Sequence, residues 1–245
     1  MLNAGDSLLL GEFLRCISDE TIFSLVESSE EKEILLNLYK NPISGIMPNI
    51  IADGSLNPKS FKIHDIQFER IIGRNVLLKQ ANKSKFLEKY KKWISEKGYL
   101  ILGENIPSQG QRLSDLIDKN FLESEFRNSL KIAEEKIYKD PRNHLCNWSP
   151  NTLKEQLECN NWEIHSWEIK EFITPILIRK EQIEKWFPNQ NEEDTQSSYS
   201  KNISSHFSTN QLRKLSEIFY QSIGGKVVNW KSNFVFMKLS KKNMP

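Results

Sequence analysis

Three carboxylates in this chain stand at or just past the end of a short apolar run: Glu27, Asp53 and Glu104. A carboxylate in such a place can accept hydrogen bonds from two neighbouring hydroxyls, as the acid of dinucleotide-binding folds does with a ribose. Gly5 lies in the opening loop, where a residue without a side chain lets backbone N–H groups approach a ligand closely. We therefore look for binding chemistry at these four positions.

Two polar donors, Arg74 and Asn75, follow another apolar run and favour contact with a substrate. Each candidate also has a structural alternative. Asp53 precedes Gly54 in a common turn pair, Glu27 can serve as an acid near a helix N-terminus, and Arg74 with Asn75 can form a solvated turn. The sequence leaves both interpretations open at these positions.

The elements that must position these side chains alternate between strand and helix. Short runs of strand-forming residues lie between segments with helical spacing of apolar residues. In the first part of the chain we predict strands over residues 21–26, 49–52, 68–72 and 99–102, and helices over 8–17, 28–39 and 83–95, the last one stopped by Gly98.

The second part of the chain continues this pattern, with more predicted helices than strands. We predict helices over residues 113–117, 124–138, 150–159, 174–187 and 209–223, a strand over 162–169, and two final strands over 227–230 and 233–239 joined by Lys231-Ser232. Residues 189–200 are polar and acidic enough to form a mobile loop.

Alternating units of this kind predict an α/β fold with a mostly parallel sheet and an antiparallel C-terminal hairpin. In such sheets ligands bind at the carboxyl ends of the strands, where the candidate residues stand. We expect a single domain over residues 1–245, with a cofactor-binding half at 1–105 and a substrate or cover half at 106–245.

Composition narrows the class of protein. The chain has 245 residues, with 34 Lys and Arg against 32 Asp and Glu, so its formal net charge is only +2. This balance does not support direct nucleic-acid binding. The three cysteines are far apart and indicate reduced thiols in a cytoplasmic protein, and the four histidines show no ligand spacing, which argues against a metal site. No apolar run is long enough for a membrane span.

Taken together, these residues resemble the class I S-adenosylmethionine-dependent methyltransferases, which have a Rossmann-like sandwich fold. Asn3, Gly5 and Ser7 fall in the position of that family's glycine loop, which passes under the methionine part of the cofactor. Glu27 takes the position of the acid that binds the ribose, and Asp53 that of the acid that binds adenine. The resemblance implies S-adenosylmethionine as cofactor and covers nearly the whole chain as architecture.

The resemblance extends to the substrate side. Residues 68–75 are similar to the motif of the fourth strand, which faces the substrate, and residues 97–104 to the fifth strand. If the chain is an enzyme, a nucleophile attacks the sulfonium methyl in line, so catalysis comes mainly from proximity and orientation. Arg74, Asn75 and Glu104 would then face the substrate, with segments 109–112 and 174–200 as cover.

A narrower likeness is to the methyltransferase-like domain fused behind the replication-associated recombination AAA+ ATPase of some photosynthetic bacteria. The residues that carry it are Leu2-Asn-Ala-Gly5, Ile71-Ile-Gly-Arg-Asn75, Pro107-Ser-Gln-Gly-Gln-Arg112, Lys185-Trp-Phe187 and Tyr199. This likeness implies an ATPase module in the same polypeptide as a partner. The chain itself contains no Gly-x-x-x-x-Gly-Lys-Ser/Thr phosphate loop.

The sequence departs from the methyltransferase pattern in its first residues. Met1 stands where the acid that opens the glycine loop is expected, the loop keeps one of three glycines, and the first strand is missing before it. These departures favour a second hypothesis, a non-catalytic accessory domain of the DNA replication and recombination ATPase. A dinucleotide-dependent oxidoreductase is disfavoured, because the loop lacks Gly-x-Gly-x-x-Gly.

Overall fold

A computed structural model describes residues 1–2, 7–17, 21–41, 45–54, 56–61, 66–188 and 198–242. The chain divides into two compact units that alternate along the sequence. Unit 1 comprises Met1–Asn105, Pro150–Lys170 and Phe234–Pro245, and unit 2 comprises Ile106–Ser149 and Glu171–Asn233. Among the described residues, no helix is long and apolar enough to cross a membrane.

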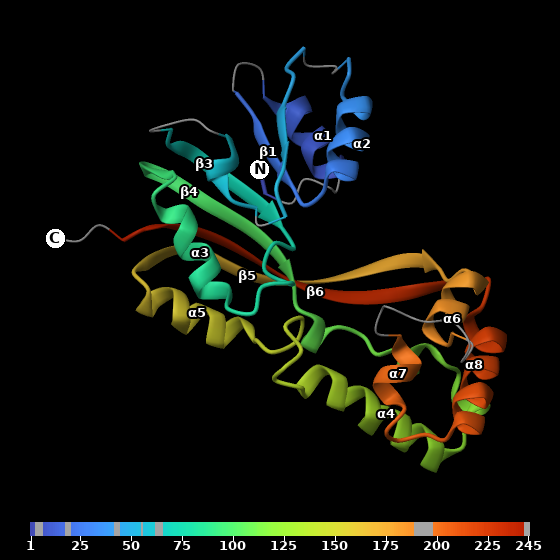
Figure 1. Cartoon of the computed structure of the whole chain (residues 1–245). Coiled ribbons are helices and arrows are strands. Elements are labelled where there is room, and N and C mark those ends of the chain that lie inside the picture. Colours follow the sequence, from blue (N-terminus) through green and yellow to red (C-terminus); the bar gives the residue numbers. More distant parts are fainter. Residues whose placement is uncertain are drawn as a thin grey trace. The chain divides into compact units, whose positions relative to one another are not determined.

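The sheet of unit 1 is built from two groups of strands (Figure 1). β1 (Phe23–Val26) and β2 (Asn49–Ala52) run parallel, as do β3 (Phe68–Arg74) and β4 (Ile94–Asn105). β6 (Val227–Lys241) pairs antiparallel with β4 and separates it from β5 (Trp162–Leu177). The α/β prediction is confirmed, and the sheet is mixed.

Met1 and Leu2 connect the two groups of strands. The Leu2 backbone N–H donates to the Ile72 carbonyl at 2.7 Å, and the Leu25 N–H donates to the Met1 carbonyl at 2.8 Å. Leu2 forms parallel bridges with Leu25 of β1 and Gly73 of β3. These two residues therefore occupy the place between β1 and β3 where the sequence led us to expect a missing strand.

Helices cover unit 1 on different groups of strands. α1 (Ser7–Cys16) and α2 (Ser29–Leu38) pack on β1 and β2 around an apolar cluster of Leu10, Leu14, Val26, Leu35 and Ile50. The Ser28 hydroxyl and the Glu31 side chain cap α2 reciprocally, which fixes its start directly after β1. α3 (Lys83–Lys91) and α5 (Pro150–Cys159) lie on one side of β4, β6 and β5 (Figure 1).

Unit 2 is largely helical. Three short 3-10 helices, η2 (Pro107–Gln109), η3 (Leu113–Leu116) and η4 (Lys119–Phe121), lead from β4 to α4 (Ser124–Lys139). The other α-helices of this unit are α6 (Lys180–Trp186), α7 (Tyr199–Ile203) and α8 (Thr209–Ile223). Its core includes Leu130, Ile183, Ile203, Leu215 and Phe219. The 3-10 helix η1 (Pro58–Phe61) belongs to unit 1.

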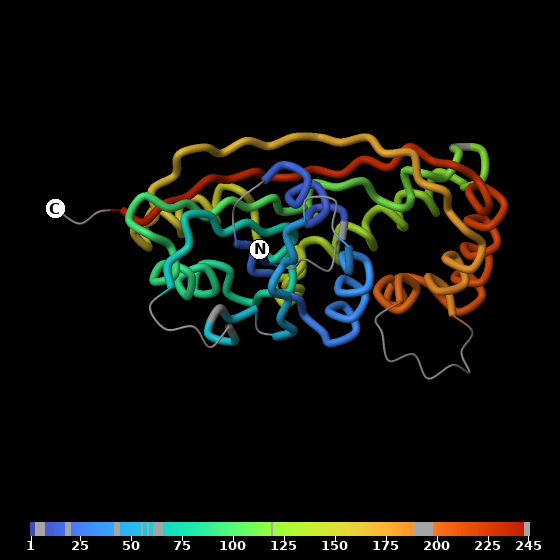
Figure 2. Tube along the Cα trace, turned by 90° about the horizontal axis from the view of Figure 1, so that it is seen from above, coloured from blue at the N-terminus to red at the C-terminus, as the bar shows by residue number. Residues whose placement is uncertain are grey.

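The two strands predicted at the C-terminal end form a single strand. Residues 227–241 form one continuous strand, β6, and β5 and β6 run side by side through both views (Figures 1 and 2). The pair Lys231-Ser232 has no glycine or proline that would turn the chain, and strand-forming residues such as Val228, Trp230 and Phe234 lie on both sides of it. β6 is therefore central, between β4 and β5, rather than half of an edge hairpin.

Two further boundaries differ from the prediction. β5 continues to Leu177, and the helix expected from residue 174 begins only at Lys180. The β-branched residues Ile173, Thr174 and Ile176 favour the extended backbone, which explains the longer strand. Gly98 does not stop a helix, because it lies within β4 beside the irregular pairing between β3 and β4.

Candidate functional site

The predicted cofactor loop lies mostly outside the described residues. Asn3 and Gly5 are not among them, and Ser7 is described only as the first residue of α1. The part of the candidate site that can be built from the structure is therefore the edge formed by the ends of β1, β2, β3 and β4.

Glu27 and Asp53 come together at this edge. The Asp53 backbone N–H donates to the Val26 carbonyl at 2.8 Å, which places the residues after β1 beside those after β2. The backbone of Gly54 passes close to Glu27, because a Cβ on Gly54 would be 3.5 Å from the Glu27 carbonyl oxygen. Two acids 26 positions apart in sequence thus lie on adjoining strand ends, as their place after parallel neighbours predicts.

The Glu27 carboxylate forms an ion pair with Lys79, from the segment that follows β3. The lysine side chain is 71% exposed and the glutamate side chain 28% exposed. The capping of α2 is done by Glu31, whose carboxylate accepts the Glu27 backbone N–H at 2.8 Å. The Glu27 side chain is therefore not used as the helix cap, and Lys79 is the neighbour that sequence reasoning missed.

Asp53 accepts hydrogen bonds from residues that follow it closely in the sequence. Its carboxylate accepts the Ser60 hydroxyl, and its carbonyl accepts the Leu56 N–H at 2.8 Å. The Tyr90 hydroxyl donates to the Leu56 carbonyl, and the pKa of Tyr90 is raised, first by burial and then by the Asp53 charge. The turn at Asp53-Gly54 is compatible with ligand binding by Asp53, since the turn is made by the Asp53 backbone carbonyl and its carboxylate accepts a hydroxyl that a ligand donor can replace.

Arg74 and Asn75 end β3 in a tight backbone arrangement. Asn75 has a positive φ of 54°, and its N–H donates to the Gly103 carbonyl at 3.0 Å. Its side-chain oxygen accepts the Asn105 N–H at 3.0 Å, so the amide holds the ends of β3 and β4 together. The Arg74 guanidinium lies 5.7 Å from the centre of the Phe234 ring, on the β6 side.

Glu104 is fully buried, and it anchors the segment after β3. Its two carboxylate oxygens accept the backbone N–H groups of Val76 at 2.9 Å and Leu77 at 3.0 Å. Burial raises the pKa of Glu104 to about 8, against the opposing effect of these hydrogen bonds and of Lys83. In this arrangement Glu104 positions Arg74 and Asn75 through the turn that follows them, and it does not itself face solvent.

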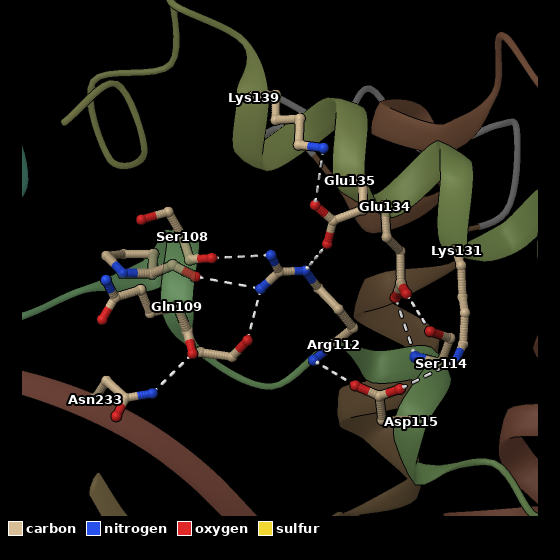
Figure 3. A network of polar contacts seen from close by, with 12 residues as sticks. Ser108, Gln109, Arg112, Ser114, Asp115, Lys131, Glu134, Glu135, Lys139 and Asn233 are labelled. Atoms are coloured by element: carbon tan, nitrogen blue, oxygen red, sulfur yellow. Dashed lines mark hydrogen bonds and ion pairs between the residues drawn. The ribbon is translucent and has the colours of Figure 1, made fainter. Parts of the chain in front are cut away.

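Segment 109–112, expected as part of a cover, is fastened inside unit 2 by Arg112 (Figure 3). Its guanidinium donates to Glu135 at 2.8 Å and to the carbonyls of Gly110 and Ser108 at 2.6 and 3.0 Å. The same guanidinium stacks 3.7 Å from the centre of the Tyr138 ring. The side chain of Arg112 therefore binds protein groups of this unit.

A second buried acid, Glu134, was not foreseen from the sequence. It accepts the backbone N–H of Ser114 at 3.1 Å and the Ser114 hydroxyl (Figure 3), and it accepts the Tyr199 hydroxyl at 2.7 Å. Burial raises its pKa, and the hydrogen bonds from Ser114 and Tyr199 oppose that rise. The only sign of this buried acid in the sequence is that Glu134 lies on the apolar side of the helix α4.

Comparison with known proteins defines the class of fold. No family model matches the chain, and no curated protein does. A solved structure of a candidate methyltransferase from Bacillus halodurans C-125 matches with a TM-score of 0.54 at 11% identity, covering 99% of this chain and 91% of that one. The YcgJ protein of Bacillus subtilis matches with a TM-score of 0.52 at 11% identity, with the same two coverages of 99% and 91%.

A third similar structure is that of a protein named for a different activity. The [4+2]-cyclase SpnF matches with a TM-score of 0.50 at 10% identity, over 99% of this chain and 74% of that one. At such low identity these similarities establish the fold, which is the Rossmann-like fold of class I methyltransferases. In this chain the spatial order is β2, β1, Met1–Leu2, β3, β4, β6, β5, and β6 runs antiparallel to β4.

Proposed function

We propose that this chain binds S-adenosylmethionine at the edge formed by Glu27 and Asp53 and transfers its methyl group to a substrate. The observation that carries the proposal is the juxtaposition of these two acids after neighbouring parallel strands. The resemblance of the sequence to class I methyltransferases supports the assignment of Glu27 to the ribose and Asp53 to adenine. The fold shared with methyltransferase structures supports it as well.

The hydrogen-bonding groups of Glu27 and Asp53 fit this cofactor. Glu27 and Asp53 are hydrogen-bond acceptors, and ribose hydroxyls and the adenine amino group are donors. Among the groups that these acids bind are the exposed Lys79 ammonium and the Ser60 hydroxyl, which are hydrogen-bond donors like those of the ligand and can be exchanged for them. When bound, the cofactor supplies an activated methyl group. Arg74 and Asn75 would orient the substrate, and Glu104 would hold these two residues in place.

Titration of S-adenosylhomocysteine by calorimetry tests this proposal. We expect binding to the unaltered chain and a loss of at least tenfold in affinity for Glu27→Ala, because the ribose hydroxyls lose their acceptor. Glu33→Ala, which removes an exposed acid from the same helix region, is the matched control and should bind like the unaltered chain. Equal affinity of all three proteins would refute the assignment of Glu27, and no binding at all would refute the cofactor.

The second candidate is a non-catalytic accessory domain, and in its narrower form a module attached to an AAA+ ATPase of DNA replication and recombination. The Lys79–Glu27 ion pair favours it, since a lysine already neutralises the acid that a cofactor would need. The same titration separates the candidates, because the accessory domain should bind no S-adenosylhomocysteine even when Lys79 is replaced by alanine.

A further inference from the structure

The side chain of Asn105, the last residue of β4, contains a buried oxygen without a hydrogen bond. The Asn105 Oδ1 is shielded from solvent, and among the described residues no donor reaches it. A buried acceptor without a donor loses its bonds to water and gains none in return, so native structures contain few such groups and each one calls for a cause. The end of β4 therefore holds an acceptor that a donor from outside the chain can satisfy.

Three more buried side-chain atoms of the described residues lack a partner, but they lie away from the carboxyl ends of the strands. They are the Ser24 Oγ within β1, the Trp93 Nε1 between α3 and β4, and the His206 Nε2 between α7 and α8. Of these four residues, Asn105 is the one that closes a strand whose carboxyl end belongs to the candidate site. Its place in the fold favours a ligand as the partner of its oxygen.

The backbone of Asn105 is fixed by the residues that end β3. The Asn105 N–H donates to the Asn75 Oδ1 at 3.0 Å, and the Asn75 N–H donates to a carbonyl of β4 at 3.0 Å. The next two N–H groups, those of Val76 and Leu77, both donate to the Glu104 carboxylate. The backbone donors at this end of β3 are therefore bound to other acceptors, and none of them can turn to the Asn105 Oδ1 without breaking a bond.

A phenylalanine ring stands beside the Asn105 amide. Asn105 pairs directly with Phe234 of β6, and directly paired residues share a face of the sheet with their Cβ atoms close together. Arg74 pairs with Gly103, two positions before Asn105 and therefore on the same face. The Arg74 guanidinium lies 5.7 Å from the centre of the Phe234 ring although β4 runs between β3 and β6, so its side chain crosses β4 at this end. The oxygen thus lies beside a half-buried ring.

We propose that the Asn105 Oδ1 binds the substrate of the methyl transfer, and that this substrate is an aromatic compound with a hydroxyl or amino group. This assignment rests on the function proposed above, which puts the substrate at the ends of β3 and β4. An amide oxygen accepts an N–H or O–H, and the Phe234 ring favours a second ring beside it. A ligand without the donor hydrogen would leave the oxygen unpaired, so Asn105 also distinguishes a substrate from its fully methylated product.

Ligand-observed NMR titration with small aromatic compounds tests this assignment. Phenol and aniline carry a donor hydrogen, whereas anisole and N,N-dimethylaniline are the same rings with that hydrogen replaced by methyl groups. With S-adenosylhomocysteine present, we expect phenol or aniline to bind more tightly than its methylated counterpart by about tenfold or more, because the counterpart leaves the Asn105 Oδ1 unpaired. The pair with the larger ratio shows whether the substrate group is a hydroxyl or an amine.

Substitutions of Asn105 connect this preference to its side chain. Asn105→Leu keeps a similar shape without the acceptor and should remove the preference, whereas Asn105→Asp keeps an acceptor oxygen and should retain it. Asn151→Leu, which replaces an exposed asparagine of α5, is the matched control and should bind all the compounds like the unaltered chain. In urea without ligands, Asn105→Leu should unfold at an equal or higher midpoint than the unaltered chain, because it removes an unpaired acceptor.

Three results would overturn the assignment. The first is equal binding of the donor compounds and their methylated counterparts, or no saturable binding of phenol and aniline to the folded chain. The second is a donor preference that persists in Asn105→Leu. The third is a clear fall in the urea midpoint of Asn105→Leu to which Arg74→Met adds nothing, because the Arg74 guanidinium would then be the donor within the fold.

Titration of S-adenosylhomocysteine separates failure of this assignment from failure of the proposed function. Binding of S-adenosylhomocysteine without a donor preference would mean that only the role of Asn105 is wrong. A donor preference in a chain that binds no S-adenosylhomocysteine would refute methyl transfer, and with it the identification of the aromatic compound as a methyl acceptor. The aromatic compounds are therefore titrated both with and without S-adenosylhomocysteine.

Discussion

Replacing Lys79 should change ligand affinity in the opposite direction to replacing Glu27. If Lys79 competes with the ribose hydroxyls for the carboxylate, Lys79→Ala should increase the affinity for S-adenosylhomocysteine. The increase should be no more than about fivefold, since exposed ion pairs contribute at most about 1 kcal/mol. Calorimetric titration measures it, with the exposed Lys85→Ala as control. Weaker binding in Lys79→Ala would mean that the lysine contacts the ligand itself.

Glu104 should make stability depend on pH. Burial raises its pKa from 4.5 to about 8, so the folded chain holds this proton to higher pH than the unfolded chain does. Between these values the folded state binds more protons, and the free energy of unfolding therefore falls as pH rises. Its stabilising contribution is fully present below about pH 4.5 and is lost as pH passes 8.

Glu104→Gln should remove this dependence. The variant should be less stable overall, because an amide NH₂ cannot accept both N–H groups, but its free energy of unfolding should be flatter between pH 5 and 8 by on the order of 1 kcal/mol per pH unit. Urea unfolding at several pH values measures the slope, and the exposed Glu33→Gln should keep the slope of the unaltered chain. An unchanged slope in Glu104→Gln would show that Glu104 is ionised throughout.

Residue types at strand ends were the most informative part of the sequence. Glu27 and Asp53 could be placed because they follow compact runs of strand-forming residues, and parallel strands bring their carboxyl ends to one edge. Their partners could not be placed. Lys79 is 52 positions from Glu27, and the pairing of surface side chains depends on how a long segment folds back. Glu104 looked like a ligand-facing acid, because burial of a carboxylate cannot be read from its neighbours in sequence.

At the scale of elements, Glu134 links three parts of unit 2. It lies on α4 and binds Ser114 of η3 and Tyr199 of α7. Tyr199→Phe should lower the free energy of unfolding by about 1–3 kcal/mol, because a buried carboxyl loses one of its donors. Urea unfolding measures the change, and Tyr220→Phe, a tyrosine that is 41% exposed, serves as control and should change little. Equal stability of the two variants would exclude a structural role for the Tyr199 hydroxyl.

Elements with strong local signals were predicted well. Residues 150–159 and 209–223 form the expected helices α5 and α8; Pro150 is the first residue of α5, and the Ser208 hydroxyl caps α8 by accepting the Gln211 N–H. Residues 49–52 form the expected strand β2. Apart from the helix expected to end at Gly98, the errors fell on β5 and β6, which are long strands with much exposed surface. Their extent depends on pairing with each other and with β4 rather than on local propensity.

At the scale of the whole molecule, average composition was a poor guide to local surface. A net charge of +2 gives no sign of a local group of cations, yet the fold places Arg70, Arg74 and Lys238 on one face of the sheet. These residues come from two strands, β3 and β6, and β6 is the strand that was predicted as two separate strands. A surface assembled from distant segments becomes visible only when the strand order is known.

The central place of β6 also has a consequence for biosynthesis. β6 supplies the partner of β4, but its residues are made more than a hundred positions after those of β4. While the chain emerges from the ribosome, the edge of β4 is an unpaired strand with apolar side chains, open to pairing with other nascent chains. The late arrival of residues 234–241 therefore predicts slow completion of the sheet and a dependence on chaperones during synthesis.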